Sequence, residues 1–292
     1  MAQNTQLFKE FSYYLKIERS LSPNTVKGYC SDIEAFLEKT GLKATEVDSA
    51  DIADYIASRA GEISERSQSR IISALRSFYD WMILEGEMKE NPCDKVDSPK
   101  IERYLPEVLS VEEVDTILDS VDLSTATGIR DRAILETLYG CGLRVSEACS
   151  LKISCIFRDE GFIRIIGKGD KERIVPAGEM TLDALDAYFE VREEPAHGYE
   201  DFVFLSRFGK PLSRVSMFNM VKKQALTAGI TKEISPHTFR HSFATHLIEN
   251  GADLRAVQEM LGHESILTTE IYTHIDTLTW QGSILAHHPR RK

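Results

Sequence analysis

The 292-residue sequence lacks the features that would anchor it in a membrane or cross-link it covalently. No stretch approaches the roughly 18 uninterrupted apolar residues of a membrane span, and the N-terminus lacks the apolar core of a secretory signal. The five cysteines include no C-x-x-C pair, so neither a disulfide framework nor a thiolate zinc site is indicated. We therefore expect a soluble protein of the cytoplasm.

Positive charge is also scarce, since 35 lysines and arginines face 46 acidic residues and the formal net charge is −11. This balance argues mildly against nucleic acid as a partner, because phosphate binding uses Lys and Arg. The distribution of charge matters more than the sum. Residues 204–226 contain no acidic residue and carry Arg207, Lys210, Arg214, Lys222 and Lys223. This segment is compatible with a basic face on an acidic protein.

Hydrophobic spacing predicts a helical N-terminal domain over residues 1–90. Apolar residues recur there at helical intervals, and four helices are expected, the second with Ser22 as N-cap and Pro23 at its first position. Residues 91–108 carry three prolines and show no clear period. They are predicted to form an extended interdomain linker.

The remaining residues, 109–292, are predicted to form a second domain that is mainly α-helical. β-Branched runs at 162–166 and 173–175 flank a Gly-Lys-Gly-Asp turn, which indicates a hairpin in a small antiparallel sheet. The predicted fold class is therefore mainly α, with two domains.

The stretch SPHTFRHSFATH gathers cations at the start of a predicted helix. With Ser235 as N-cap and Pro236 in the first position, His237 and Arg240 lie three apart on one helical face, beside free backbone N–H groups. This arrangement suits an anion. His237 and His241 also have a spacing used by zinc sites, but no Glu follows the first His and the nearby arginine would repel a dication. A capped surface helix with incidental histidines is the remaining alternative.

Four further positions could carry chemistry, and each has an ordinary structural alternative. Arg144 in GLRVSE could simply pair with Glu147, and Lys168 at the hairpin tip could be a solvated turn lysine. The phosphate-loop pattern G-x-x-x-x-G-K-[ST] is not matched around Lys168. His263 follows a helix-ending Gly262, and Tyr272, nine residues later, could be a packed aromatic.

Taken in order, GLRVSE, GKGDKER, HTFR, LGH and IYTH resemble the catalytic motifs of the tyrosine recombinases, the phage integrase-like family, and most of all its bacterial Xer branch. The resemblance covers essentially the whole chain. It implies a SAM-like, four-helix core-binding domain and a catalytic domain that together form a C-shaped clamp on double-stranded DNA. It also implies strand cleavage without metal, ATP or other cofactor, with the catalytic set Arg144, Lys168, His237, Arg240, His263 and the nucleophile Tyr272, supported by Glu147.

The same resemblance implies roles for these residues. Tyr272 attacks the scissile phosphate, two arginines stabilise the added negative charge, and Lys168 protonates the leaving 5′-oxygen. His237 is the candidate base for the phenol, and His263 donates a hydrogen bond to the phosphate. Candidate DNA contacts are Thr25, Lys27, Arg66, Ser67, Arg70, Arg76, Arg207 and Arg214. Arg76 is turned away from Arg70 on its helix, and a solvated charged face is the alternative for each.

The implied task is resolution of chromosome dimers at a dif-like site through a Holliday junction. The implied partners are a XerC-like recombinase in a cyclic heterotetramer, or further copies in a homotetramer, and a DNA translocase of the FtsK type. Apolar residues after Tyr272 are expected to dock into a neighbouring protomer, with packing on their own domain as the alternative: Leu278, Trp280, Ile284 and Leu285. A mobile-element integrase, a type IB topoisomerase-like enzyme and a non-cleaving DNA-binding accessory protein remain alternatives.

Overall fold

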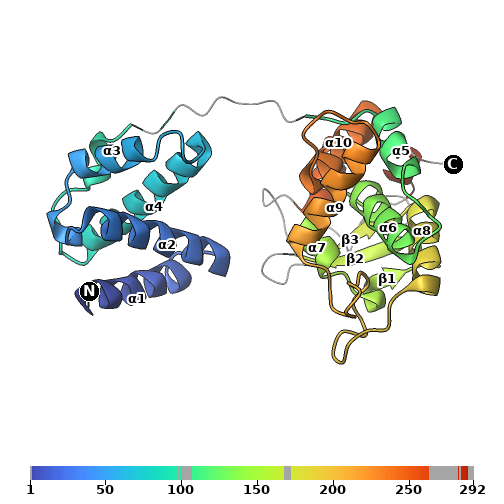
Figure 1. The fold of residues 1–292 in the computed structure, drawn as a ribbon, viewed down its shortest axis with the longest axis horizontal. Coiled ribbons are helices and arrows are strands. Elements are labelled where there is room, and N and C mark those ends of the chain that lie inside the picture. The colour runs from blue at the N-terminus through green and yellow to red at the C-terminus, as the bar shows by residue number, and fades with distance from the viewer. Residues whose placement is uncertain are drawn as a thin grey trace. The chain divides into compact units, whose positions relative to one another are not determined.

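The chain divides into two compact units, residues 1–104 and 105–292, seen in Figure 1 as a blue-to-cyan part and a green-to-red part. This computed structural model describes residues 2–97, 99, 107–167, 172–262, 282 and 284–288. Each unit has its own hydrophobic core, and no residue belongs to both. No helix of the described residues has the length and apolar character needed to cross a membrane.

The N-terminal unit is helical, as predicted. Its packing centre is aromatic, because the Phe11 ring lies 5.2 Å from that of Phe78 and 5.5 Å from that of Trp81. Ser22 caps the second helix by accepting a hydrogen bond from the Thr25 backbone at 3.2 Å, which confirms the predicted start. Over residues 2–97 the α-helices are α1 (Ala2–Ile17), α2 (Pro23–Thr40), α3 (Ser49–Ser58) and α4 (Glu65–Leu84), with a 3-10 turn η1 (Ala44–Glu46).

The first part of the predicted linker is folded onto this unit. A 3-10 turn, η2 (Pro92–Lys95), packs against α3 and α4, and Cys93 is fully buried. Arg76 donates a hydrogen bond to the Cys93 carbonyl at 3.1 Å, while the Asn91 side chain bonds the Arg76 carbonyl and Asp80. An extended linker beginning at residue 91 is therefore not what the structure shows, because these bonds hold residues 91–95 to α4.

The second unit places a small sheet among helices (Figure 1). The sheet has the strand order β1-β2-β3, all antiparallel, among the described residues. The predicted hairpin is confirmed, and the added two-residue strand β1 is too short to be recognised from periodicity. In chain order the elements are α5 (Val111–Asp119), α6 (Ala126–Gly140), α7 (Val145–Cys149), η3 (Ile153–Cys155), β1 (Ile156–Phe157), β2 (Phe162–Ile166), β3 (Glu172–Pro176), α8 (Glu179–Val191), α9 (Arg214–Thr227), α10 (Pro236–Glu249) and α11 (Leu254–Leu261).

Four contacts between elements bring distant parts of this unit together. Helix α10 packs against α6, α9 and α11, and α11 packs against β3. In the hairpin, Ile165 pairs with Arg173 and Ile163 with Val175, so Arg173 shares the buried face of β3 with Val175. The end of α11, the face of β3 and the starts of α7 and α10 consequently meet in one place.

The last described residues, 284–288, pack on the second unit. Ile284 is buried in the core of the second unit. The His287 ring nitrogen Nδ1 lies 2.6 Å from the Asn250 carbonyl oxygen, and the Asn250 side chain bonds the His287 carbonyl at 3.0 Å. These bonds, together with burial of Ile284, hold residues 284–288 in place. Leu278 and Trp280 lie outside the described residues.

Candidate active site

The start of α7 joins a cation and a carboxylate. Arg144 is the N-cap residue, and Glu147, three positions later, accepts a hydrogen bond from the Arg144 backbone N–H at 2.8 Å. The same carboxylate lies 2.9 Å from Nη1 of Arg144. Nη2 of Arg144 donates to the Gly262 carbonyl at 3.0 Å, yet the side chain keeps 37% of its surface exposed. Arg144 is therefore both held in place and accessible to a ligand.

Helix α10 carries His237 and Arg240, the two residues predicted to share a helical face. Ser235 is its N-cap and Pro236 its first residue, as predicted. His237 is exposed and Arg240, almost one turn later, is buried. Nη1 of Arg240 donates to the Gly142 carbonyl at 2.7 Å and Nη2 donates to the Leu261 carbonyl. Arg240 is thus fixed between the turn before α7 and the end of α11.

A third arginine, Arg173 on β3, was missed by sequence reasoning. Its guanidinium forms two hydrogen bonds of 2.8 Å to the two carboxylate oxygens of Glu147, and its Nε donates to the Met260 carbonyl at 2.7 Å. The only available signal was a charged residue in a β-branched run. That signal becomes informative once the register puts position 173 on the buried face.

The cluster carries net positive charge, because Arg144, Arg173 and Arg240 surround the single carboxylate of Glu147. Burial alone would raise the pKa of Glu147, but the hydrogen bonds and charge of Arg173 and then Arg144 lower it. Burial, followed by repulsion from Arg144, lowers the pKa of Arg240 to about 10. Glu147 and Arg240 both stay charged near neutral pH, and the excess of guanidinium groups over carboxylates suits the site to an anion.

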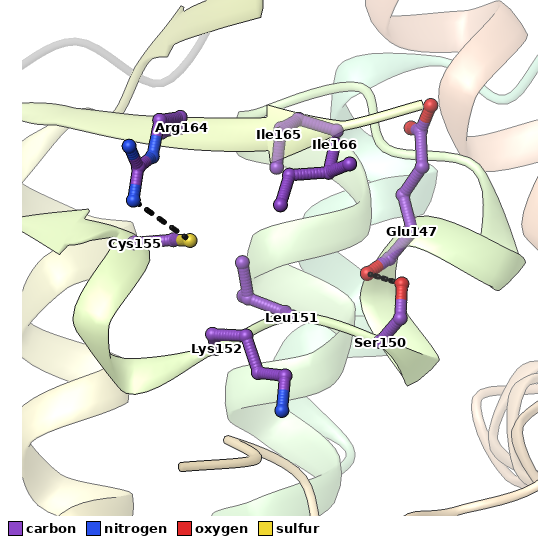
Figure 2. Close-up of a pocket in the computed structure, with 8 residues that line it drawn as sticks. All are labelled: Glu147, Ser150, Leu151, Lys152, Cys155, Arg164, Ile165 and Ile166. Carbon is purple, nitrogen blue, oxygen red and sulfur yellow. Dashed lines mark hydrogen bonds between the residues drawn. The ribbon is translucent and has the colours of Figure 1, made fainter. Parts of the chain in front are cut away.

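A small pocket borders the other side of Glu147. It is lined by residues of α7, η3, β2 and the segment between α7 and η3, including Ser150, Lys152, Cys155 and Arg164. Figure 2 shows the Glu147 carboxylate pointing away from this pocket, while its backbone carbonyl faces Ser150. The pocket therefore lies behind the charged cluster, and we assign it no role in binding an anion.

The remaining predicted catalytic residues, Lys168, His263 and Tyr272, lie outside the described residues. In sequence, Lys168 falls between β2 and β3, and His263 directly follows Gly262, whose carbonyl binds Arg144. The described chain contains no group of three or more His, Cys, Asp or Glu side chains placed to hold a metal.

The candidate DNA contacts differ in their surroundings. Arg66 and Lys27 are exposed, and Arg70 is half-exposed while paired with Asp32 of α2. The Thr25 hydroxyl is hydrogen-bonded to that of Ser22 at 2.8 Å. Ser67 likewise pairs with Ser64, Arg76 is occupied at η2, and Arg207 and Arg214 are exposed in the second unit.

Comparison with known proteins identifies the chain. The Phage integrase family model matches residues 107–278, and the Phage integrase, N-terminal SAM-like domain matches residues 8–86. The chain belongs to the phage integrase family. It is a tyrosine recombinase, a member of a family of enzymes that cleave and rejoin DNA.

Individual relatives cover almost the whole recombinase. Tyrosine recombinase XerD of Listeria monocytogenes serovar 1/2a is 42% identical, over 97% of this chain and 99% of the relative. Tyrosine recombinase XerD of Chlorobaculum tepidum is 43% identical, over 96% of this chain and 95% of the relative. The crystal structure of XerA recombinase is 31% identical with a TM-score of 0.51, covering 98% of this chain and 99% of that one. A lambda integrase dimer bound to a COC′ core site shares the fold, with a TM-score of 0.71 at 20% identity and coverage of 91% and 98%.

Proposed function

We propose that this recombinase acts at specific sites, cutting and rejoining DNA strands through a 3′-phosphotyrosyl bond to Tyr272 and a Holliday junction. The observation that carries the proposal is the cluster in which Arg144 and Arg240, distant in sequence, are braced around Glu147. Preorganised arginines are the groups that a metal-free enzyme needs to stabilise a five-coordinate phosphorane. The accessible face of Arg144 gives a phosphate its point of entry.

The proposed reaction conserves the phosphodiester bond energy. The Tyr272 oxygen forms a bond to phosphorus as the bond to the 5′-oxygen breaks, and His237 accepts the phenol proton. Lys168 supplies a proton to the departing 5′-oxygen, while His263 and the two arginines bind the phosphate oxygens. The free 5′-hydroxyl then attacks the phosphotyrosyl bond of a partner, which releases the tyrosine and joins the exchanged strand.

The proposed biological role is resolution of chromosome dimers at a dif-like site in the cytoplasm. The support is the identity of 42–43% to relatives named XerD over nearly their full length. The proposed partners are a XerC-like recombinase in a cyclic heterotetramer, or copies of this chain, and a translocase of the FtsK type. Exposed Lys27, Arg66, Arg207 and Arg214 are the candidate DNA contacts that have the most freedom to reach a phosphate.

Covalent capture of DNA tests this function directly. DNA linked to the wild-type recombinase is isolated from cells under denaturing conditions and its ends are sequenced, in parallel with Tyr272→Phe. We expect one sharp genomic site in the wild type and none in the variant, because phenylalanine lacks the nucleophilic oxygen. The position of this site distinguishes chromosome resolution from service to a mobile element.

Other outcomes would support the alternatives. Scattered ends that disappear with Tyr272→Phe would indicate a topoisomerase. No protein-linked DNA in either strain, with a XerC-like partner co-expressed, would refute cleavage and leave a DNA-binding accessory protein. A gel-shift assay with both proteins shows that the variant still binds DNA and serves as the control.

A further inference from the structure

Glu147 has more hydrogen bonds than an isolated ion pair with Arg144 would give it. Arg173 bonds Oε1 and Oε2 at 2.8 Å each, while Arg144 bonds Oε1 through its side chain at 2.9 Å and Oε2 through its backbone at 2.8 Å. Both oxygens are therefore shared between the two arginines. Arg173 therefore fixes the orientation of the Glu147 carboxylate, and this orientation determines where the Arg144 side chain can bond it.

Arg173 also fixes the end of α11. Its Nε donates to the Met260 carbonyl, and the next two carbonyls along the chain, of Leu261 and Gly262, accept hydrogen bonds from Arg240 and Arg144. The buried Arg173 guanidinium thus contacts both Glu147 and the end of α11, the two features that orient Arg144 and Arg240. Arg173 is itself only 8% exposed, so these contacts leave it little access to a ligand.

We propose that Arg173 is a positioning residue of the recombinase: it clamps Glu147 and the last turn of α11 so that Arg144 and Arg240 keep the orientation in which they bind the scissile phosphate. The inference rests on the proposed roles of Arg144 and Arg240. A displacement of about 1 Å in a reacting constellation can cost on the order of 10²-fold in rate. We therefore expect Arg173→Gln to lower the rate of covalent complex formation by about 10²-fold, with DNA affinity changed less than the rate.

The effect should depend on pH. The charged groups facing the Glu147 carboxylate are Arg144 of α7, Arg173 of β3 and Arg240 of α10, while Lys152 and Arg164 line the pocket behind it. Burial raises the pKa of Glu147, and the hydrogen bonds and charge of Arg173 are the largest effect that lowers it. Removing Arg173 therefore raises the pKa of Glu147. Protonated Glu147 holds Arg144 poorly, and the ratio of the Arg173→Gln rate to the wild-type rate should fall as the pH is lowered.

The experiment measures single-turnover formation of the covalent protein–DNA complex on a nicked half-site of the sequence found by capture, between pH 6 and pH 9. It compares wild type, Arg173→Gln, Arg173→Lys and the same changes in a Glu147→Gln background. Arg192→Gln is the matched control, since Arg192 also donates to backbone carbonyls but lies in another part of the unit. Circular dichroism melting and gel shift establish folding and DNA binding for each variant.

We expect a pH-dependent loss in Arg173→Gln, partial rescue by Arg173→Lys, which keeps the charge but lacks the two-pronged geometry, and no pH-dependent loss on top of Glu147→Gln. An Arg173→Gln protein that is folded and keeps the wild-type rate and pH profile would overturn the proposal, and so would a loss that is equal at every pH and additive with Glu147→Gln. Arg144→Ala separates the two hypotheses: if it too cleaves normally, the proposed phosphate site is wrong, whereas loss in Arg144→Ala alone refutes only the role of Arg173.

Discussion

At the scale of single residues, Arg240 shows why this site needs arginine and not just positive charge. Its two terminal nitrogens bind the Gly142 and Leu261 carbonyls, which lie on different segments. Arg240→Lys keeps a cation but has one nitrogen where two are needed, so it cannot hold both carbonyls and present a donor to phosphate. We expect the rate of covalent complex formation to fall by about 10²–10³-fold, as measured by single-turnover cleavage.

The exposed Arg207 provides the control for this substitution. Its guanidinium lies over the Phe208 ring, 4.7 Å from the ring centroid, and it forms none of the hydrogen bonds that hold Glu147. Arg207→Lys should leave the cleavage rate within a few-fold of wild type. Equal rates for Arg240→Lys and Arg207→Lys would mean that charge alone suffices at position 240, contrary to the bonding geometry.

The residues of the site differ in how far the sequence could predict them. Ser235 and Pro236 indicate the start of α10 by local chemistry, so the shared face of His237 and Arg240 follows from helix geometry. Arg173 could not be found in this way, because its partner is 26 positions away and its burial depends on strand register. The contact of Arg144 with the Gly262 carbonyl spans 118 positions, and it too requires the tertiary fold.

At the scale of elements, the turn between α6 and α7 is closely packed next to the site. Gly142 has φ of +58°, and a Cβ there would lie 2.5 Å from the Phe243 ring and 3.0 Å from Leu261. Gly142→Ala therefore combines left-handed strain with overpacking, and the clash alone typically costs about 1–3 kcal/mol. We expect lower stability in urea unfolding, and slower cleavage because the Gly142 carbonyl that holds Arg240 must move.

Gly229, which follows α9, separates strain from crowding. Its φ is +76° and a Cβ added there would meet no other atom within 4 Å, so Gly229→Ala introduces the backbone strain alone. The difference in unfolding free energy between the two variants measures the cost of the steric clash at Gly142. Equal unfolding free energies for Gly142→Ala and Gly229→Ala would show that the Phe243 ring can shift to admit the added methyl group without loss of stability.

Element boundaries were predictable only where local sequence decides them. The capped helices and the hairpin follow from Ser-Pro starts and β-branched runs, and the structure has them. The turn η2 and the docked residues 284–288 do not, because burial of Cys93 and Ile284 against distant helices decides their positions. Proline-rich composition alone therefore overestimated the length of extended chain after residue 90.

At the scale of the whole molecule, two separate cores predict two unfolding events. The cores of the two units share no residue, and each unit is compact with a hydrophobic core of its own, as an independently folding domain is. Differential scanning calorimetry of the full chain should therefore resolve two transitions. Gly142→Ala, which disturbs the second core, assigns them, since it should lower only the transition of the second unit.

Acid should affect these two transitions unequally because of His246. Burial, the largest cause, lowers the pKa of this histidine from 6.5, and its Nδ1 lies 2.8 Å from the Tyr139 hydroxyl oxygen. The unfolded chain then binds a proton at a pH where the folded chain does not, so stability is lost as the pH falls below the unfolded value of about 6.5. Between pH 7.5 and pH 5.5 the second transition should move to lower temperature, and His246→Asn, which cannot ionise, should reduce this shift. An identical acid shift in wild type and His246→Asn would show that other groups destabilise the unit.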